Sequence, residues 1–440
     1  MYRKMDCRTG IVWQKGTKMA VIRPFRAYRP TKGMESKIAA LPYDVYNRAE
    51  ACAVVQQNPD SFLAIDRAET QFGPEVSTYA PEVYAKARDM IRERIEKGAF
   101  IQEEKACYYL YEQTMDGRSQ TGIVACASID DYQNNVIKKH ENTRADKEQD
   151  RINHVDVCNM QTGPIFLAYR SNAVLQELTG KVKRQEPLYD FVSEDGIGHR
   201  VWVVGDAEDI RTVEETFGTI SEIYIADGHH RCASAVKVGL KRRAEHPDYT
   251  GDEEFNYFLS VLFPDEELKI LDYNRVVKDL NGLTAEQFID KVQEKFTVSR
   301  QTDAVQGKGY APTQKGEFGM YLDGVWYRLQ AKPEICSADA VDGLDVSILQ
   351  EHLLQPILGI GDPKTDKRID FVGGIRGLSE LERRCTGLPE GDASKMRVAF
   401  SMYPTSIAEL FAVADANRLM PPKSTWFEPK LRSGLFLHEL

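Results

Sequence analysis

The chain has 440 residues, of which 42% are hydrophobic, 28% charged and 10% aromatic. This composition is typical of a globular protein with a sizeable core, and it excludes disordered, collagen-like and low-complexity proteins. The 67 Asp and Glu residues outnumber the 57 Lys and Arg residues and give a formal net charge of −10. Such a surface is poorly suited to non-specific binding of nucleic acid or an anionic membrane, since both need positive potential.

The cysteines and the first residues indicate the cellular compartment. The eight cysteines lie at least 19 residues apart, so no CxxC or zinc-knuckle spacing occurs. No apolar run reaches the roughly 18 residues of a membrane span, and residues 1–18 lack the apolar core of a signal peptide. We therefore expect a reduced, cytoplasmic protein. Because Met19 stands just before a strand-like run, residues 1–18 are interpreted as a disordered extension or a misassigned start.

The predicted elements of the first half mix hairpins with helices. Residues 21–30 favour a strand, and residues 41–69 are rich in turn signals and favour loops. Apolar residues at three- and four-residue spacing predict a helix over 80–97. Two strand-like runs around Asp116 and Gly117 predict a hairpin. Further strands are predicted at 164–170, 188–192, 200–205 and 221–226, and further helices at 173–183, 207–217 and 232–245.

The second half continues this mixture. A hairpin turned at Asp323 and Gly324 is predicted, and the composition of 301–315 favours a surface loop or small insertion. Strands are predicted at 255–264, 268–277 and 397–404, and a helix at 406–415. We therefore predict an α+β fold with mixed β-sheets and flanking helices. The predicted division is 1–18, 19–263 and 264–440, with a basic tail that returns to the functional site.

The most informative motif is the run Asp227, Gly228, His229, His230 and Arg231 between a predicted strand and a predicted helix. The unpaired amides of the helix, an arginine and two imidazoles together suit a phosphate group. Asp227 could cap the helix, hold Mg²⁺ or accept a proton, and Gly228 allows close backbone approach. The plainer interpretation is a capped helix with surface histidines. A metal centre of Asp227, His229 and His230 is a third, although no HxH or HExxH spacing supplies further ligands.

A second cluster begins at His140 and Glu141 and enters a predicted helix, for which Thr143 and Asp146 predict a capping box. Four basic or potentially basic residues follow at spacing that predicts one helical stripe: Arg144, Lys147, Arg151 and His154. A solvated face with interleaved acids is the ordinary meaning of such a run. A zincin is rejected because Arg144 stands where HExxH needs its second histidine. Glu141 is of interest as a general base beside phosphate-holding cations.

Several nucleotide-binding motifs are absent from the sequence. It contains no P-loop, no GxGxxG after a strand and no HRD or DFG pair, so phosphoryl chemistry here would not use a P-loop. The irregular tail over 420–436 carries Lys423, Lys430 and Arg432. It is interpreted either as an ordered tail anchored by its aromatic residues or as a strap that closes an anion pocket.

The DGHHR unit resembles that of the free serine kinases of the ParB/sulfiredoxin-like superfamily. More widely, a series of motifs from about 19 to 435 is similar to a large, mostly uncharacterised bacterial and archaeal family, often labelled ParB-like and associated with pyrophosphate-dependent phosphorylation of L-serine. These motifs are RPFRAYRP, LPYDV, NPDSFL, KKHENT, DR, ADGHHR and MPPKSTWFEPKLRSGL. The resemblance implies a ParB/sulfiredoxin-like core.

The resemblance also implies a mechanism. A Mg²⁺-dependent kinase would phosphorylate the hydroxyl of free L-serine with inorganic pyrophosphate, or ADP or ATP, as donor. Glu141 would be the base, with Asp227 and His230 as further catalytic residues and Asp227 facing the metal. The expected phosphate-binding residues are Gly228, His229, Arg231, Arg144, Lys147 and Arg151. The second-tier substrate contacts are Asp44, Arg48 and Lys423.

Two alternatives from other classes stay open. One is a ParB-like nucleotide-dependent DNA-binding protein, although no convincing helix-turn-helix or basic stripe is found. The other is a non-catalytic sensor of a phosphorylated metabolite. The charge is unevenly spread, since 23–48 carries six basic and two acidic residues and 418–432 four basic and one acidic. The acidic total therefore restricts the size of a phosphate ligand and does not exclude one, and the oligomeric state is not indicated.

Overall fold

The computed structural model describes residues 18–301 and 309–440. Residues 1–17 of the predicted extension over 1–18 and residues 302–308 of the predicted insertion over 301–315 lie outside these ranges. The chain divides into two compact units. Within the described ranges, unit 1 comprises 18–138, 143–266 and 431–440, and unit 2 comprises 139–142, 267–301 and 309–430.

Unit 1 is built on a mixed nine-stranded sheet with the order β6-β11-β8-β12-β5-β4-β10-β9, in which β1 also pairs with β5. The pairs β6–β11 and β8–β12 are parallel, and the others are antiparallel. The strands are Ile22–Arg23 (β1), Tyr108–Met115 (β4), Arg118–Ser128 (β5), Ile137–Lys138 (β6), Ile165–Tyr169 (β8), Tyr189–Val192 (β9), Gly198–Val204 (β10), Ile223–Asp227 (β11) and Tyr257–Pro264 (β12).

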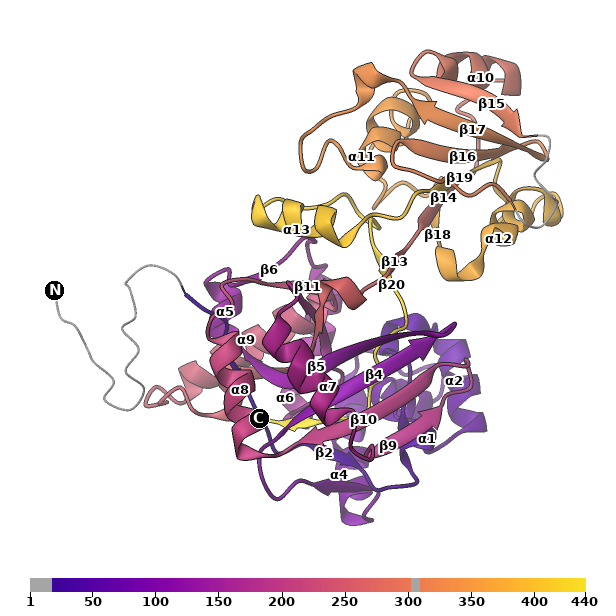
Figure 1. Cartoon of the computed structure of the whole chain (residues 1–440). Helices are drawn as coiled ribbons and strands as arrows, with labels where there is room; N and C mark the ends of the chain where they lie inside the picture. Colours follow the sequence, from indigo (N-terminus) through magenta and orange to yellow (C-terminus); the bar gives the residue numbers. More distant parts are fainter. Residues whose placement is uncertain (1–17, 302–308) are drawn as a thin grey trace. The chain divides into compact units, whose positions relative to one another are not determined.

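Along the chain, the helices of unit 1 are interspersed with these strands, and Figure 1 labels most of them. They are Glu35–Ile38 (α1), Arg48–Gln57 (α2), Leu63–Asp66 (α3), Pro81–Glu96 (α4), Ile129–Gln133 (α5), Ala145–Cys158 (α6), Ala173–Val182 (α7), Ala207–Phe217 (α8) and His229–Glu245 (α9). Tyr43–Val45 forms a short 3₁₀ turn, η1. Two small sheets complete the unit and pair Tyr28–Pro30 (β2) with Phe100–Gln102 (β3) and Met160–Gln161 (β7) with His438–Glu439 (β21).

The core of unit 1 follows the two-residue alternation of its strands. On one face, alternate residues such as Leu110 and Leu167 pack with apolar residues of α7, α8 and α9. On the other face, Tyr109 and Tyr111 contact Phe436 of the C-terminal segment, with ring centroids 5.0 and 6.1 Å away. The last ten residues are therefore part of the packing of unit 1.

Unit 2 is built on an antiparallel six-stranded sheet with the order β15-β17-β16-β19-β14-β18. Its strands are Tyr273–Val277 (β14), Phe296–Gln301 (β15), Glu317–Leu322 (β16), Val325–Ala331 (β17), Ile369–Gly373 (β18) and Val398–Met402 (β19). A separate pair joins Ile270–Leu271 (β13) to Trp426–Phe427 (β20). The helices are Ala285–Gln293 (α10), Asp345–Leu349 (α11), Leu378–Glu382 (α12) and Ile407–Asp415 (α13).

The α+β prediction with mixed sheets is confirmed, and the finer expectation of a ParB/sulfiredoxin-like core stays a prediction. Both predicted hairpins form, and Asp116 and Asp323 adopt the positive φ of their turns. The loop prediction for 41–69 was wrong over α2, whose Asn47 and Glu50 form a capping box. The capping box predicted at Thr143 and Asp146 was also wrong. The helix begins at Ala145, and the Thr143 hydroxyl donates instead to the Glu148 carboxylate, 2.7 Å away.

No helix within 18–301 and 309–440 combines the length and apolar character that crossing a membrane requires. All seven cysteines in these ranges are free thiols.

A substitution at Gly434 would test how tightly the C-terminal segment is held in unit 1. Its φ is +83°, and an added Cβ would stand 2.6 Å from Phe62 Cβ. We expect Gly434→Ala to lower the free energy of unfolding by about 1–3 kcal/mol, because both the backbone and the close contact are strained. Gly196→Ala is the matched control, since Gly196 also has positive φ but no atom lies within 4 Å of the added Cβ. Urea unfolding should show the larger loss for Gly434→Ala, and equal losses would contradict the account.

Candidate phosphate site

The DGHHR motif forms the turn between β11 and α9. Asp227 ends the strand, Gly228 has a φ of +91°, and the helix begins at His229. The Gly228 amide donates to Asp227 Oδ1, 2.8 Å away. The predicted start of this helix at 232 was three residues late, because Gly228 provides the left-handed residue that lets the helix begin directly after it. The first amides of α9 therefore lie at the motif itself.

Arg231 folds back over this turn. Its Nη1 donates to the carbonyl of Pro164 at 2.5 Å. Its Nε and Nη2 both lie 3.1 Å from the position that a Cβ on Gly228 would occupy. This edge of the guanidinium is the one that could bind a phosphate bidentately. Gly228 thus serves the site twice, through its φ and through the space that it leaves for Arg231.

His230 contacts the start of α6. Its Nε2 accepts a hydrogen bond from the backbone amide of Arg144 at 2.9 Å. Burial lowers the pKa of His230, although Asp44 works in the opposite direction. The imidazole is therefore the neutral acceptor in this contact. This hydrogen bond indicates that His230 holds the backbone in place just before α6 begins. The catalytic role predicted for His230 stays a prediction.

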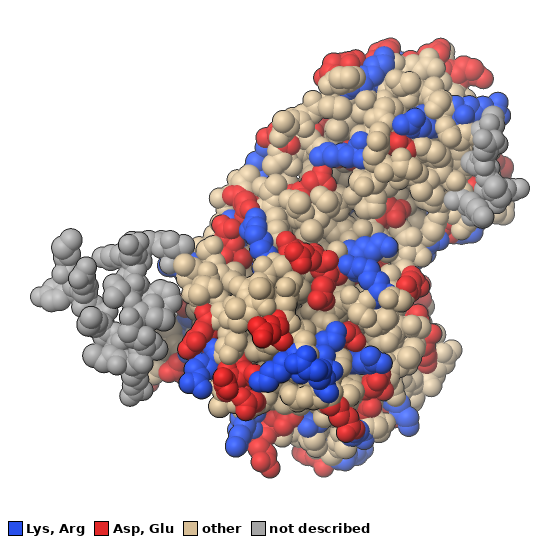
Figure 2. Space-filling model, viewed as in Figure 1, with Lys and Arg blue, Asp and Glu red and all other residues tan. Residues whose placement is uncertain are grey.

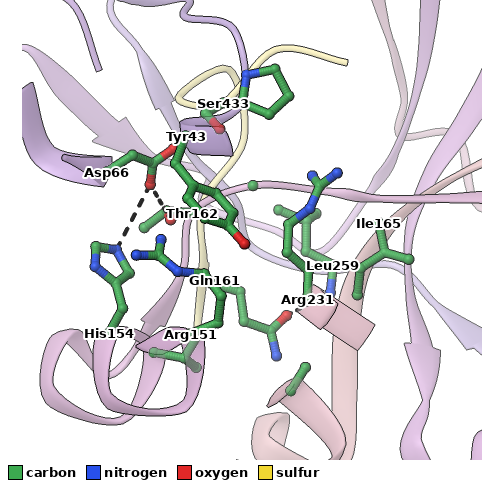
Figure 3. Close-up of a pocket in the computed structure, with 14 residues that line it drawn as sticks. Tyr43, Asp66, Arg151, His154, Gln161, Thr162, Ile165, Arg231, Leu259 and Ser433 are labelled. Atoms are coloured by element: carbon green, nitrogen blue, oxygen red, sulfur yellow. Dashed lines mark hydrogen bonds and ion pairs between the residues drawn. The ribbon is translucent and has the colours of Figure 1, made fainter. Parts of the chain in front are cut away.

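A cavity lies beside the turn within unit 1, and Figure 3 shows its lining. The side chains come from segments that are far apart in the sequence. They are Tyr43 of η1, Asp66 of α3, Arg151 and His154 of α6, Thr162 after β7, Arg231 of α9 and Ser433 of the C-terminal segment. A second cavity adjoins it and shares Tyr43, Asp66, Arg151 and His154. Lys147 lines this second cavity.

Arg151 provides the buried positive charge of the cavity. Its guanidinium lies 4.0 Å from the centre of the Tyr43 ring, and Nε donates to Asp150 Oδ2 at 3.0 Å. Burial works to lower the pKa of Arg151, but Asp150, Tyr43 and Asp66 outweigh it and raise the pKa. Asp150 is held in turn by the Tyr84 hydroxyl, which donates at 3.0 Å. A cation so placed attracts an anionic group.

Asp66 and His154 face each other in the cavity. His154 Nε2 lies 3.8 Å from Asp66 Oδ1, and the Thr162 hydroxyl donates to that same oxygen at 2.9 Å. Burial raises the pKa of Asp66, whereas the charge of Arg151 and hydrogen bonds from Ser433 and Thr162 act to lower it. Burial and the charge of Arg151 hold the pKa of His154 well below its usual range. Burial also raises the pKa of Tyr43 to about 12.

The structure gathers some predicted site residues and separates others. Arg151 and Arg231 line one cavity, and Lys147 lines its neighbour. Arg144 does not share this stripe, because it caps α6 and its exposed side chain pairs with Asp146. Glu141 belongs to the short 139–142 segment of unit 2. His229 is buried in the first turn of α9.

The second-tier residues differ in their surroundings. The Arg48 guanidinium donates to the carbonyls of Val76, Glu69 and Gly73, which indicates a role in holding that loop. Asp44 is exposed in η1, next to Tyr43. Lys423 belongs to unit 2, and its Nζ lies 5.5 Å from the centre of the Tyr273 ring. Their substrate contacts stay predictions.

Four residues that line the cavity were not predicted from the sequence, namely Tyr43, Asp66, Thr162 and Ser433. Tyr43 belongs to LPYDV and Ser433 to the terminal motif, so the motif series held a signal for both. Asp66 ends the apolar run that follows NPDSFL, where a carboxylate in an otherwise buried segment is unusual. Only long-range packing brings these residues together.

The buried position of Arg151 leads to a stability prediction. Arg151→Lys keeps the charge but loses the planar group on Tyr43 and one donor to Asp150. We expect the free energy of unfolding to fall by about 1.5–3 kcal/mol, the value of a hydrogen bond to a charged group. Arg200→Lys is the control, because the exposed Arg200 pairs with exposed Asp190. Urea unfolding with equal effects for both variants would contradict the role of Arg151.

Comparison with solved structures gives low similarities. A free serine kinase in complex with AMP has 14% identity and a TM-score of 0.31, covering 72% of this chain and 91% of that chain. A conserved hypothetical protein from Pyrococcus furiosus has 15% identity and a TM-score of 0.32, covering 72% and 95%. C-terminally truncated SbnI from Staphylococcus aureus has 10% identity and a TM-score of 0.35, covering 72% and 87%. No curated protein matches the chain.

A protein family matches the larger part of the sequence. It is described as "Protein of unknown function (DUF1015)", and the match covers residues 22–347. The matched range contains the DGHHR turn and every cavity residue except Ser433. Because this range is more than half of the chain, the protein belongs to the DUF1015 family.

Proposed function

We propose that the protein is a small-molecule kinase that transfers a phosphoryl group to the hydroxyl of free L-serine. The observation that carries this proposal is the cavity beside the DGHHR turn, which Arg231 and Arg151 both line near the start of α9. Phosphoryl transfer needs mainly positioning and charge stabilisation, and cations with helix amides supply both. L-serine as acceptor comes from the resemblance of the motif series.

The donor is proposed to be inorganic pyrophosphate, with ADP or ATP as alternatives. The two adjoining cavities have volumes of about 30 and 110 Å³. Sites for drug-sized ligands are typically about 300–1,000 Å³, so this space favours a small phosphate compound over a nucleotide. Basic and acidic side chains are interspersed over the face in view in Figure 2, which offers no broad cationic surface for DNA there.

The proposed Mg²⁺ would depend on its phosphate ligands. Within residues 18–301 and 309–440, no group of three or more His, Cys, Asp or Glu side chains could hold a metal. Asp227, at the end of β11, is the single carboxylate proposed for it. Mg²⁺ is commonly held by one or two carboxylates together with substrate phosphates, so this donor set fits Mg²⁺ bound with the donor. When bound, it would neutralise charge on the phosphates.

The residues of the chain have separate roles in this proposal. The first amides of α9 and the Nε and Nη2 edge of Arg231 bind the transferred phosphoryl group, and Gly228 permits its approach. His230 holds the start of α6 through the Arg144 amide. Glu141 is kept as the general base on the resemblance alone. It would take the proton of the serine hydroxyl as that oxygen attacks the phosphorus, while pyrophosphate leaves as phosphate.

The first test is formation of O-phosphoserine. The full chain is incubated with L-serine, Mg²⁺ and either pyrophosphate, ADP or ATP, and the product is followed by ³¹P NMR. We expect product with pyrophosphate and none without L-serine. Glu141→Gln should abolish turnover while pyrophosphate binding stays close to that of the wild type. Unchanged turnover would remove Glu141 from the mechanism, and absence of product with every donor would contradict the kinase proposal.

The second test concerns the turn. Gly228→Ala places a Cβ 3.1 Å from the Arg231 guanidinium and strains a φ of +91°. We expect the KM for the donor to rise about tenfold or more, since Arg231 must move from the phosphate position. Gly251→Ala is the control, because Gly251 has a φ of +98° and open space around the added Cβ. A donor KM that is equal in the two variants would exclude Arg231 from donor binding.

A further inference from the structure

The part of the cavity formed by Asp66 and His154 has no role in the mechanism above. Both side chains are almost fully buried, with 3% and 4% exposure. Their facing atoms, Asp66 Oδ1 and His154 Nε2, are 3.8 Å apart, and His154 Nε2 has no hydrogen-bond partner within the described ranges. A buried polar atom without a partner costs free energy, and such atoms are rare in folded proteins. A polar group bound against the pair would give this nitrogen a hydrogen-bond partner.

The charges around this space have both signs. Asp66 supplies a buried carboxylate from α3, and Arg151 supplies a buried guanidinium from α6. Figure 3 shows Asp66 and His154 on one side of the Tyr43 ring and Arg231 on the other. A purely anionic ligand would face repulsion from Asp66, and a purely cationic one would face repulsion from Arg151. A zwitterion satisfies both groups.

The hydrogen-bonding groups of Asp66 and His154 are suited to binding an ammonium group. The Thr162 hydroxyl already donates to Asp66 Oδ1, which fixes the carboxylate without neutralising it. The low pKa of His154 keeps its imidazole neutral, so it can accept a hydrogen bond. An ammonium group donates up to three hydrogen bonds. It would stabilise the charged form of Asp66, which burial alone disfavours.

We propose that Tyr43, Asp66, Arg151 and His154 bind the zwitterionic head of a free α-amino acid, with its ammonium on Asp66 and its carboxylate on Arg151. The inference rests on the proposed function and deepens it, since it assigns the acceptor to one part of the cavity and leaves Arg231 to the phosphoryl group. The small volumes of the two adjoining spaces restrict the ligand to a molecule of this size.

Calorimetric titration of the full chain without a phosphate donor tests the site directly. The probes are L-serine, L-alanine without the hydroxyl, ethanolamine without the carboxylate and 3-hydroxypropionate without the ammonium. We expect both amino acids to bind and each of the two other probes to bind about tenfold more weakly or worse. Equal binding of a probe that lacks one charge, or no binding of either amino acid, would overturn the proposal.

Variants then assign the binding to the named residues. Asp66→Asn keeps the shape of the side chain and removes its charge, and should raise the Kd for L-alanine about tenfold or more. Asp209→Asn is the matched control, because Asp209 of α8 is also buried in unit 1 but pairs with Lys181 of α7. Circular dichroism checks folding. If Asp66→Asn does not fold, Thr162→Val decides, since it keeps the carboxylate but removes its hydrogen bond and should weaken L-alanine binding severalfold. Unchanged binding in the folded variant would overturn the proposal.

The results separate this inference from the kinase proposal. Amino-acid binding that needs Asp66, without O-phosphoserine from any donor, would support the site and contradict the kinase. Formation of O-phosphoserine with an unchanged KM for serine in Asp66→Asn would support the kinase and overturn the site. If Asp66→Asn instead lowers kcat while serine binding stays unchanged, Asp66 acts in proton transfer and not in ammonium binding.

Discussion

The site depends on the contacts that the buried guanidinium of Arg151 makes with Asp150 and Tyr43. A charge in the interior is tolerated only with partners, and here α6 supplies Asp150 while η1 supplies the face of Tyr43. Asp150 in turn accepts from Tyr84 of α4. One charge thus fixes the relative positions of η1, α4 and α6 in unit 1. A buried ion pair such as Arg151–Asp150 adds little net stability, but it specifies one arrangement of the elements that carry its partners. A binding site needs its elements held in one arrangement.

The cavity is assembled from distant parts of the sequence. Some of its lining residues belong to LPYDV, DR, DGHHR and the terminal motif, so four of the recognised motifs each contribute to one space. The last ten residues return to unit 1, where Ser433 pairs with Ala40 through a backbone bridge and β21 pairs with β7. The cavity is therefore complete only when the segment around Tyr43 and the last ten residues have both folded into unit 1.

Local chemistry explains which elements could be predicted from the sequence. The hairpins at Asp116 and Asp323 follow from turn residues that tolerate positive φ, and α8 follows from an apolar period with Asp206 as its cap. The Thr143 capping box failed because Glu148 takes that hydroxyl, and His230, which is 86 positions away from Arg144, takes the Arg144 amide. The DGHHR turn was recognisable because its residues are contiguous in the sequence. Asp66 and Tyr43 were not, since nothing local marks them as neighbours of Arg151 and Arg231.

The central claim is that the DGHHR turn and Arg231 bind a phosphate group in this cavity. A crystal structure of the full chain grown with pyrophosphate and Mg²⁺ tests it most directly. The account predicts an anion that accepts hydrogen bonds from the first amides of α9 and from the Nε and Nη2 edge of Arg231. Pyrophosphate bound elsewhere, with only water at the turn, would contradict it.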